Sequence, residues 1–180
     1  MPGSLQWPKP GEVPEWLNGA VSKTVKGSNA LREFESLPLR NIPAMKNIEI
    51  LFVAGFGPVT QQPASRSFYE TTLGIAFDEM SDGYLHTQKL TGTRYFALWP
   101  LGHAAESCFG TSEWPQDIPA PQAWIEFDVA DIQAATKELE SQGYKLLVAA
   151  REEPWGQTVT RLLSPEGLLV GITHTPWQRS

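Results

Sequence analysis

The chain has 180 residues and a formal net charge of −6 at pH 7. This length suffices for one domain with a buried core, and the negative charge argues against a broad nucleic-acid surface. The single cysteine, Cys108, excludes an intrachain disulfide and a cysteine-based zinc site. No apolar run in the sequence is long enough to span a bilayer, and Met1 begins no secretory signal, so we expect no membrane association and a cytoplasmic setting.

Residues 1–44 differ from the rest of the chain. They are rich in proline, and no amphipathic period in them lasts longer than about two turns, so we expect a poorly structured N-terminal extension. Residues 12–25 resemble a peptide that recurs where a transfer-RNA gene has been translated, which would place the natural start at Met45. The alternative is a genuine N-terminal arm that docks through its aromatic side chains.

Residues 45–101 predict a first module with the order strand, helix, strand, strand, strand. The helix is expected at residues 65–73, and the strands at residues 48–54, 75–79, 84–90 and 94–99. A loop bearing glycine and proline is expected at residues 55–58, directly after the first strand. Residues 101–122 are interpreted as a long ordered loop with at most one short helical turn, and loops of this length are often functional.

Residues 123–177 repeat the same order of elements. The first segment of this module alternates, which places Trp124 and Glu126 on one face of a strand whose other face is apolar. Asp131 stands where it can cap the following helix. The tight turn Ser164–Gly167 predicts a hairpin between the last two strands. Two modules of like order can combine into one domain, because each sheet needs a partner face to bury.

Three short motifs carry a family resemblance. They are Phe68-Tyr69 with Leu73-Gly74 in the first helix, Phe127–Asp131 before the second helix, and Ser164–Gly167 before the last strand. In this order, residues 45–180 resemble the vicinal-oxygen-chelate superfamily, which includes glyoxalases, ring-cleaving dioxygenases and bleomycin-resistance proteins. The likeness is strongest to the glyoxalase/bleomycin-resistance branch. It implies an α+β fold, in which two βαβββ modules (45–101 and 123–177) build one domain with a curved mixed sheet around a cleft.

The resemblance also bears on metal binding. Members that catalyse reactions usually hold a divalent metal through His, Glu or Gln on the first and last strand of each module. Carried over to this chain, those positions fall on Ile48, Ala97, Trp124 and Gly171, and none of these side chains ligates a metal. We therefore expect no metal and no other cofactor. A rearranged divalent-metal site built on Glu126 and a histidine is the alternative.

The candidate ligand-binding residues are mostly aromatic. Strand alternation places Phe52, Trp99, Trp124 and Glu126 on the faces that line the cleft. The full candidate set adds one imidazole, one further indole and one guanidinium: His86, Trp155 and Arg161. Aromatic walls with a carboxylate suit a flat or cationic ligand.

Plainer interpretations stand beside this one. Trp99 and Trp124 would then fill the core, and Glu126 would form a structural ion pair with Arg161. His86 would be a hydrogen-bonded strand residue, and Trp155 would shape a loop by packing on the sheet. Catalysis by Cys108 is not expected, because a nucleophilic cysteine needs a base within reach and only His103 is near in sequence.

The sequence thus favours a metal-free protein that binds and sequesters a small aromatic or cationic molecule, rather than an enzyme. Two alternatives remain: a metal-dependent lyase, isomerase or dioxygenase of the glyoxalase type, and a non-catalytic regulatory or structural module. The resemblance also implies a homodimer.

Overall fold

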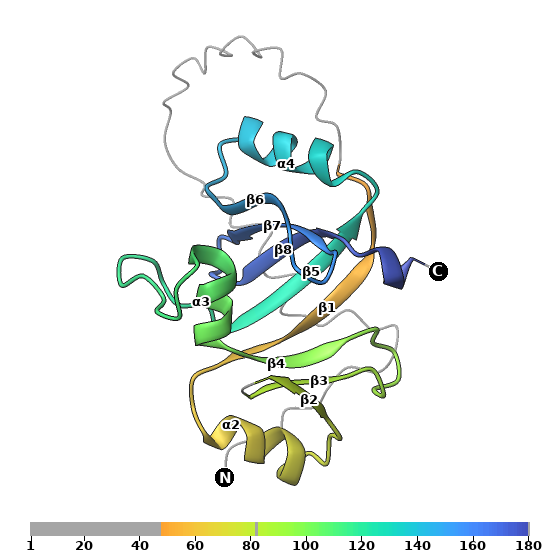
Figure 1. The fold of residues 1–180 in the computed structure, drawn as a ribbon, viewed down its shortest axis with the longest axis vertical. Helices are drawn as coiled ribbons and strands as arrows, with labels where there is room; N and C mark the ends of the chain where they lie inside the picture. Colours follow the sequence, from red (N-terminus) through yellow and green to blue (C-terminus); the bar gives the residue numbers. More distant parts are fainter. Residues whose placement is uncertain (1–47, 82, 180) are drawn as a thin grey trace, which may run out of the picture. The chain divides into compact units, whose positions relative to one another are not determined.

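The computed structural model describes residues 48–81 and 83–179, which form two modules of the same order (Figure 1). The first module comprises β1 (Ile50–Thr60), the short helix α2 (Ala64–Ser67), the π-helical turn η1 (Phe68–Thr72), β2 (Asp78–Ser81), β3 (Tyr84–Thr87) and β4 (Phe96–Pro100). The second comprises β5 (Ala123–Val129), α4 (Ile132–Ser141), β6 (Leu146–Glu152), β7 (Thr158–Leu163) and β8 (Leu169–His174). The helix α3 (Leu101–Phe109) lies between the modules, and a 3-10 turn, η2 (Pro176–Gln178), follows the last strand.

The eight strands of the described residues form one sheet with the order β2-β3-β4-β1-β5-β8-β7-β6. The modules meet where β1 and β5 pair antiparallel. Each of these first strands also pairs parallel with the last strand of its own module, β1 with β4 and β5 with β8. The sheet curves without closing (Figure 1). The predicted α+β fold of two βαβββ modules is confirmed.

Local signals in the second module act as the sequence indicates. The backbone N–H of Ala134 donates to the Asp131 carboxylate over 2.9 Å, which caps α4. The helix buries Ile132 and Ala135 against the sheet. Gly143 ends the helical region with a φ of 82°, a conformation that glycine adopts without strain.

The first strand is longer than predicted. β1 continues through residues 55–58, where the glycines and Pro58 predicted a loop. Here glycine serves close packing: a Cβ on Gly57 would lie 1.9 Å from the carbonyl oxygen of Ala97 on the neighbouring strand. A Cβ on Gly55 would lie 2.9 Å from the ring of Trp124. Glycine in a strand interior can mark such a close approach as well as a turn.

The connector between the modules also differs from its prediction. Instead of a loop with at most one helical turn, it begins with the nine-residue helix α3. This helix buries small side chains, Ala104, Ala105 and Cys108, and ends at Gly110 with a φ of 75°. Because these side chains are small, the helix packs close to the sheet and places polar side chains beside it.

Strand β2 begins later in the chain than predicted. β2 occupies Asp78–Ser81 rather than residues 75–79, because Ile75 and Phe77 pack against a cluster around Leu85 instead of pairing. The expectations for residues 1–44 and for a start at Met45 lie outside the described residues. No helix among the described residues is long and apolar enough to cross a membrane.

Candidate functional site

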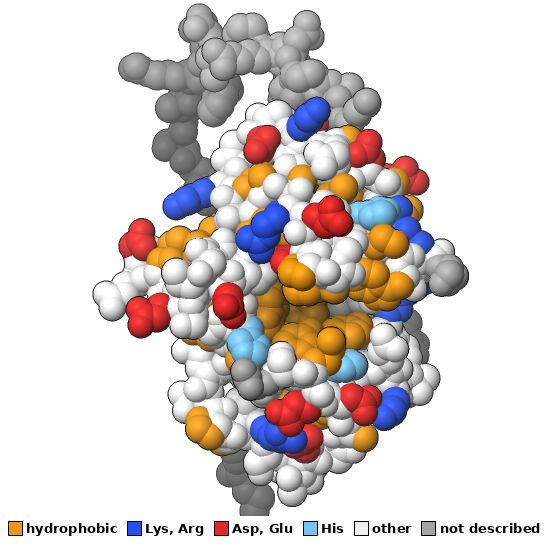
Figure 2. Space-filling view, viewed as in Figure 1, with side chains coloured by type: hydrophobic (Ala, Val, Ile, Leu, Met, Phe, Trp, Pro, Cys, Tyr) orange, Lys and Arg blue, Asp and Glu red, His pale blue; other side chains and the backbone are white. Residues whose placement is uncertain are grey.

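A cavity of about 1100 Å³ is lined by residues of both modules, of α3 and of the chain after β8. Figure 2 shows a hollow at the centre of one face, bordered by hydrophobic side chains. A cavity of this size and lining is large enough for a drug-sized molecule.

The first module lines the cavity with rings. Tyr84 and His86 come from β3, while Tyr95 precedes β4 and Trp99 lies on it. The His86 imidazole stacks on the Tyr95 ring, with a centroid distance of 5.2 Å and an interplanar angle of 12°. Burial, with the neighbouring Tyr95, raises the pKa of the Tyr84 hydroxyl well above its ordinary value, so it stays neutral at physiological pH. Among the described residues, this module contributes no Asp, Glu, Lys or Arg to the lining.

Two tryptophans join the walls at the inner end of the cavity. The rings of Trp99 and Trp124 meet edge to face, with centroids 5.5 Å apart. Both side chains are buried in the central hydrophobic cluster, and both also line the cavity. They therefore fill the core, as the plainer interpretation holds, and also present aromatic surface to the cavity.

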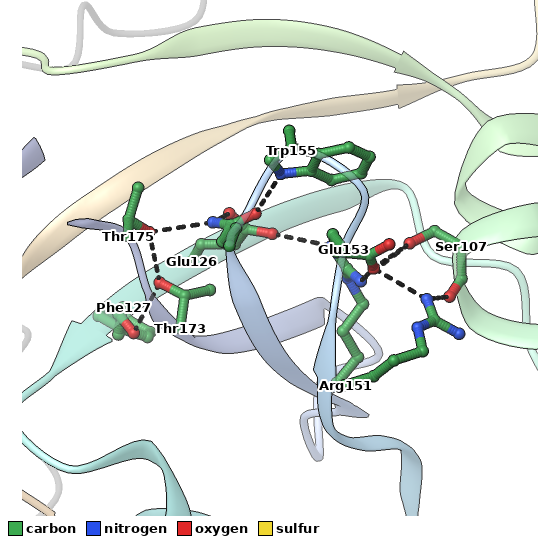
Figure 3. Close-up of polar contacts among 10 residues, drawn as sticks. Ser107, Glu126, Phe127, Arg151, Glu153, Trp155, Thr173 and Thr175 are labelled. Carbon is green, nitrogen blue, oxygen red and sulfur yellow. Dashed lines mark hydrogen bonds and ion pairs between the residues drawn. The ribbon is translucent and has the colours of Figure 1, made fainter. Parts of the chain in front are cut away.

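The second module lines the cavity with charge. The Arg161 guanidinium, which is 2% exposed, donates to Glu126 over 3.2 Å and to Glu153 over 2.8 Å. The same guanidinium donates to the Ser107 hydroxyl on α3 over 2.8 Å. The predicted ion pair between Glu126 and Arg161 is therefore present, within a larger network. Figure 3 shows Glu126, Glu153 and Ser107 of this network.

A second arm of this network fixes the other oxygen of Glu126. The Gln157 amide donates to Glu126 over 3.1 Å and to the Thr175 hydroxyl over 3.0 Å. The Trp155 indole N–H donates to the Gln157 side-chain oxygen over 3.1 Å (Figure 3). Both carboxylate oxygens of Glu126 thus accept hydrogen bonds, which is what a buried charge requires.

The row of residues under this network explains its geometry. Gly55, Glu126, Gly171 and Arg161 are successive register partners across β1, β5, β8 and β7. A Cβ on Gly171 would lie 2.6 Å from Cγ of Glu126. The missing side chain therefore lets Glu126 lie flat over β8 and reach Arg161.

A bulge in β6 positions the side chain of a second arginine, Arg151, beside Glu153. The pairing of β6 with β7 shifts between Val148 and Arg151, and Ala150 between them has a φ of 41°. A bulge of this kind redirects the side chain that follows it. Here Arg151 donates to Glu153 over 2.8 Å and also to the Ser107 carbonyl oxygen.

Burial and nearby charges together shift two pKa values in this region. Burial raises the pKa of the Glu153 carboxyl, but hydrogen bonds and charges from Arg151 and Arg161 outweigh it and hold the pKa below its ordinary value. Burial raises the pKa of the Cys108 thiol to about 11, against the opposing effect of Arg161. A thiol with this pKa is protonated at neutral pH, which agrees with the expectation that Cys108 is not a nucleophile.

Comparison with known proteins identifies the family. The sequence model of the glyoxalase/bleomycin resistance protein/dioxygenase superfamily matches residues 57–172, more than half of the chain. The chain belongs to this superfamily. No curated protein matches it.

Solved structures match this chain at low identity. A glyoxalase/bleomycin resistance protein/dioxygenase superfamily member from Vibrio splendidus 12B01 is 17% identical, with 69% of this chain and 97% of that chain covered and a TM-score of 0.43. Methylmalonyl-CoA epimerase from Mycobacterium tuberculosis is 19% identical, with 73% and 93% covered and a TM-score of 0.45. These values support no inference about a substrate.

The metal positions carried over from the superfamily can now be placed. Ile48 lies before β1 and packs in the cluster under α4, so its assignment to the cleft is wrong; Ala54 is the β1 side chain that lines the cavity. Ala97 is the register partner of His86, and Gly171 lies under Glu126.

This donor set does not fit a divalent metal. Alanine and glycine offer no ligating side chain at these positions, and the carboxylate nearest to them, Glu126, is already engaged by Arg161 and Gln157. Within residues 48–81 and 83–179, no three His, Cys, Asp or Glu side chains lie close enough together to hold a metal.

The structure brings six of the seven candidate residues together. The side chains that line the cavity are His86, Trp99, Trp124, Glu126, Trp155 and Arg161. Phe52 does not line it; the Arg94 guanidinium lies over its ring at 3.9 Å from the centroid. Irregularities in the pairing of β1 with β5 interrupt the alternation between Ile50 and Gly55, so a parity argument from Phe52 fails.

Several lining residues were missed. Tyr84 and Tyr95 share parity with His86 and Trp99, so strand alternation could have identified them. Ser107 and Glu153 carry no such signal, because their positions depend on α3 and on the turn after the β6 bulge.

Proposed function

We propose that this protein binds a flat, positively charged aromatic molecule in the cavity and sequesters it without changing it, using no metal. One observation carries the proposal: the cavity is lined by aromatic rings and, among its exposed residues, by carboxylates. The alanine and glycine at the usual metal positions offer no donor to an ion, and Glu126 lies over the glycine.

The charge balance of the lining supports a cation. Four carboxylates line the cavity, Glu106, Glu126, Glu152 and Glu153, against two guanidiniums, Arg151 and Arg161, so the lining has two excess negative charges (4 − 2 = 2). The network neutralises Glu126 and Glu153. The excess therefore resides on Glu106 and Glu152, which are exposed and available to a ligand.

The rings supply the remaining affinity. Aromatic faces attract cations and stack on flat conjugated systems. The network, in contrast, holds its charges in fixed positions, so the inner floor is organised before a ligand arrives. Such preorganisation lowers the entropic cost of binding.

Calorimetric titration of the full chain with proflavine, a flat cation, tests the proposal. We expect saturable binding of proflavine and none of anthracene-2-sulfonate, a flat anion of similar size. Trp155, which is 56% exposed at the opening, provides a variant that should fold normally. Trp155→Ala is expected to weaken binding about tenfold, the size of a lost stacking or cation–π contact. Tyr144→Ala, an exposed aromatic residue outside the cavity lining, is the control.

A second titration tests the metal-free part of the proposal. Zinc, nickel and manganese are expected to leave the Kd for proflavine unchanged. None of them is expected to bind at a fixed number of ions per chain. Tight binding of one metal ion per chain would contradict the proposal and favour a metal-dependent enzyme.

A further inference from the structure

Two buried hydrogen-bond donors on side chains that line the cavity lack an acceptor. Within the described residues, neither Trp124 Nε1 nor Arg161 Nε has a hydrogen-bond partner. Both side chains line the cavity, yet they are only 4% and 2% exposed. An unpaired buried donor is costly, so native structures rarely keep one unless a ligand or an ordered water meets it.

The two side chains that carry these donors both lie against the ring of Trp99. Trp124 contacts Trp99 edge to face, and the guanidinium carbon of Arg161 lies 5.2 Å from the centroid of the Trp99 ring. Glu126 does not serve them: it accepts from Arg161 Nη2 and from Gln157, but from neither unpaired donor. His86 Nδ1 on the opposite wall is also without a partner, but it donates or accepts according to its tautomer and so selects neither type of ligand atom.

From this arrangement, and resting on the proposed function, we propose that the ligand carries a hydrogen-bond acceptor on the edge that enters the cavity. A carbonyl oxygen or an unprotonated ring nitrogen would receive the N–H groups of Trp124 and Arg161. The positive group of the same ligand then remains at the opening, beside the exposed carboxylates of Glu106 and Glu152.

The class of ligand that follows is narrower than flat cations in general. It comprises planar conjugated molecules with a carbonyl or ring nitrogen at one edge and an amine at the other, such as aminoalkyl-substituted quinones and acridones. A flat cation without an inward acceptor would still stack in the cavity, but it would displace water from the two donors and leave them unpaired.

A matched pair of probes tests this inference. The first is an anthraquinone with one aminoalkylamino arm, and the second is the anthracene with the same arm, which keeps the rings and the charge but has no carbonyl oxygens. Calorimetric titration of the full chain is expected to give a Kd about tenfold lower for the anthraquinone, which is the effect of one net hydrogen bond in a buried site. This comparison needs no variant, so it does not depend on how a substitution folds.

A variant then assigns the preference to its donor. Trp124→Phe keeps a ring but removes the N–H, and is expected to reduce the preference to about threefold or less, the part that Arg161 supplies. The smaller ring also weakens stacking of both probes alike, so the measured quantity is the ratio of the two Kd values and not either Kd alone. Trp114→Phe is the control, because its N–H is bonded to the Ile118 carbonyl oxygen outside the cavity.

The outcomes separate the inference from the function on which it rests. Equal affinity for both probes would overturn the inference, because it would mean that water serves the donors, and would leave sequestration of flat cations intact. An unchanged preference in Trp124→Phe would overturn the assignment to Trp124. Binding of neither probe would overturn the proposed function and the inference together.

Discussion

The two walls of the cavity come from modules with the same order of elements, yet their chemistry differs. The first module supplies neutral rings, including Tyr84, Tyr95 and Trp99. The second supplies a buried network in which Arg161 binds both Glu126 and Glu153. A shared fold therefore leaves the chemistry of each wall free to diverge.

The difference also predicts how each wall tolerates change. Rings are held mainly by apolar burial, which is not directional, so substitutions of similar volume are tolerated. Buried charges are stable only while every partner is in place, and removal of one partner leaves the others uncompensated. The charged wall should therefore be much more sensitive to substitution than the ring wall.

Arg161→Met is the change that most sharply tests this contrast. It keeps the volume of the side chain but leaves Glu126 and Glu153 buried without their shared cation. We expect the free energy of unfolding in urea at pH 7 to fall by about 3–5 kcal/mol. On the ring wall, Tyr84→Phe should lower it by less than about 1 kcal/mol, because only a hydroxyl is lost. Similar losses in the two variants would refute the contrast.

Glu153→Gln tests the charged wall through pH. The folded-state pKa of Glu153 is depressed, so the carboxylate contributes stability above its unfolded pKa of about 4.3, and this contribution is lost as the pH falls through the folded value. The variant should be about 2–3 kcal/mol less stable than the parent at pH 7, the loss of hydrogen bonds to charged groups.

The stability difference between the variant and the parent should shrink as the pH falls below the pKa of the unfolded Glu153 carboxyl. Urea titrations of both proteins between pH 7 and the acid limit of folding would measure it. A difference that stays constant with pH would show that Glu153 acts through packing and not through its charge.

Gly171→Ala tests whether the absent side chain at this position makes room for Glu126. The new Cβ would lie 2.6 Å from Cγ of Glu126, so the carboxylate must move away from Arg161. We expect a loss of about 1–2 kcal/mol in the free energy of unfolding, as for other overpacked core positions. In a Glu126→Ala background the same substitution should cost less, because the obstructing side chain is gone. Equal costs in the two backgrounds would mean that Gly171 serves another purpose.

Local signals accounted for most of the second module. The alternation of residues 123–129 predicted β5 with its observed bounds, Asp131 caps α4, and Ser164–Gly167 forms the turn between β7 and β8. These signals succeed because they depend on neighbours in sequence.

Features that depend on distant partners were missed. Gly55 and Gly57 predicted a loop, but they lie inside β1 because Trp124 and the Ala97 backbone approach them closely. The sequence predicted a loop where helix α3 lies, although the buried alanines of this helix pack against the sheet.

For the site, the sequence alone determined that Trp124 and Glu126 share one face of their strand, because alternation along a strand sets its two faces. Through the family resemblance it also predicted that the usual metal positions carry no ligands. Only the tertiary structure decided which groups meet. Arg161 reaches Glu126 across Gly171, and Glu153 and Ser107 join them through a bulge and a helix. Strand register and bulges set these distances, and they depend on pairing between segments far apart in the chain.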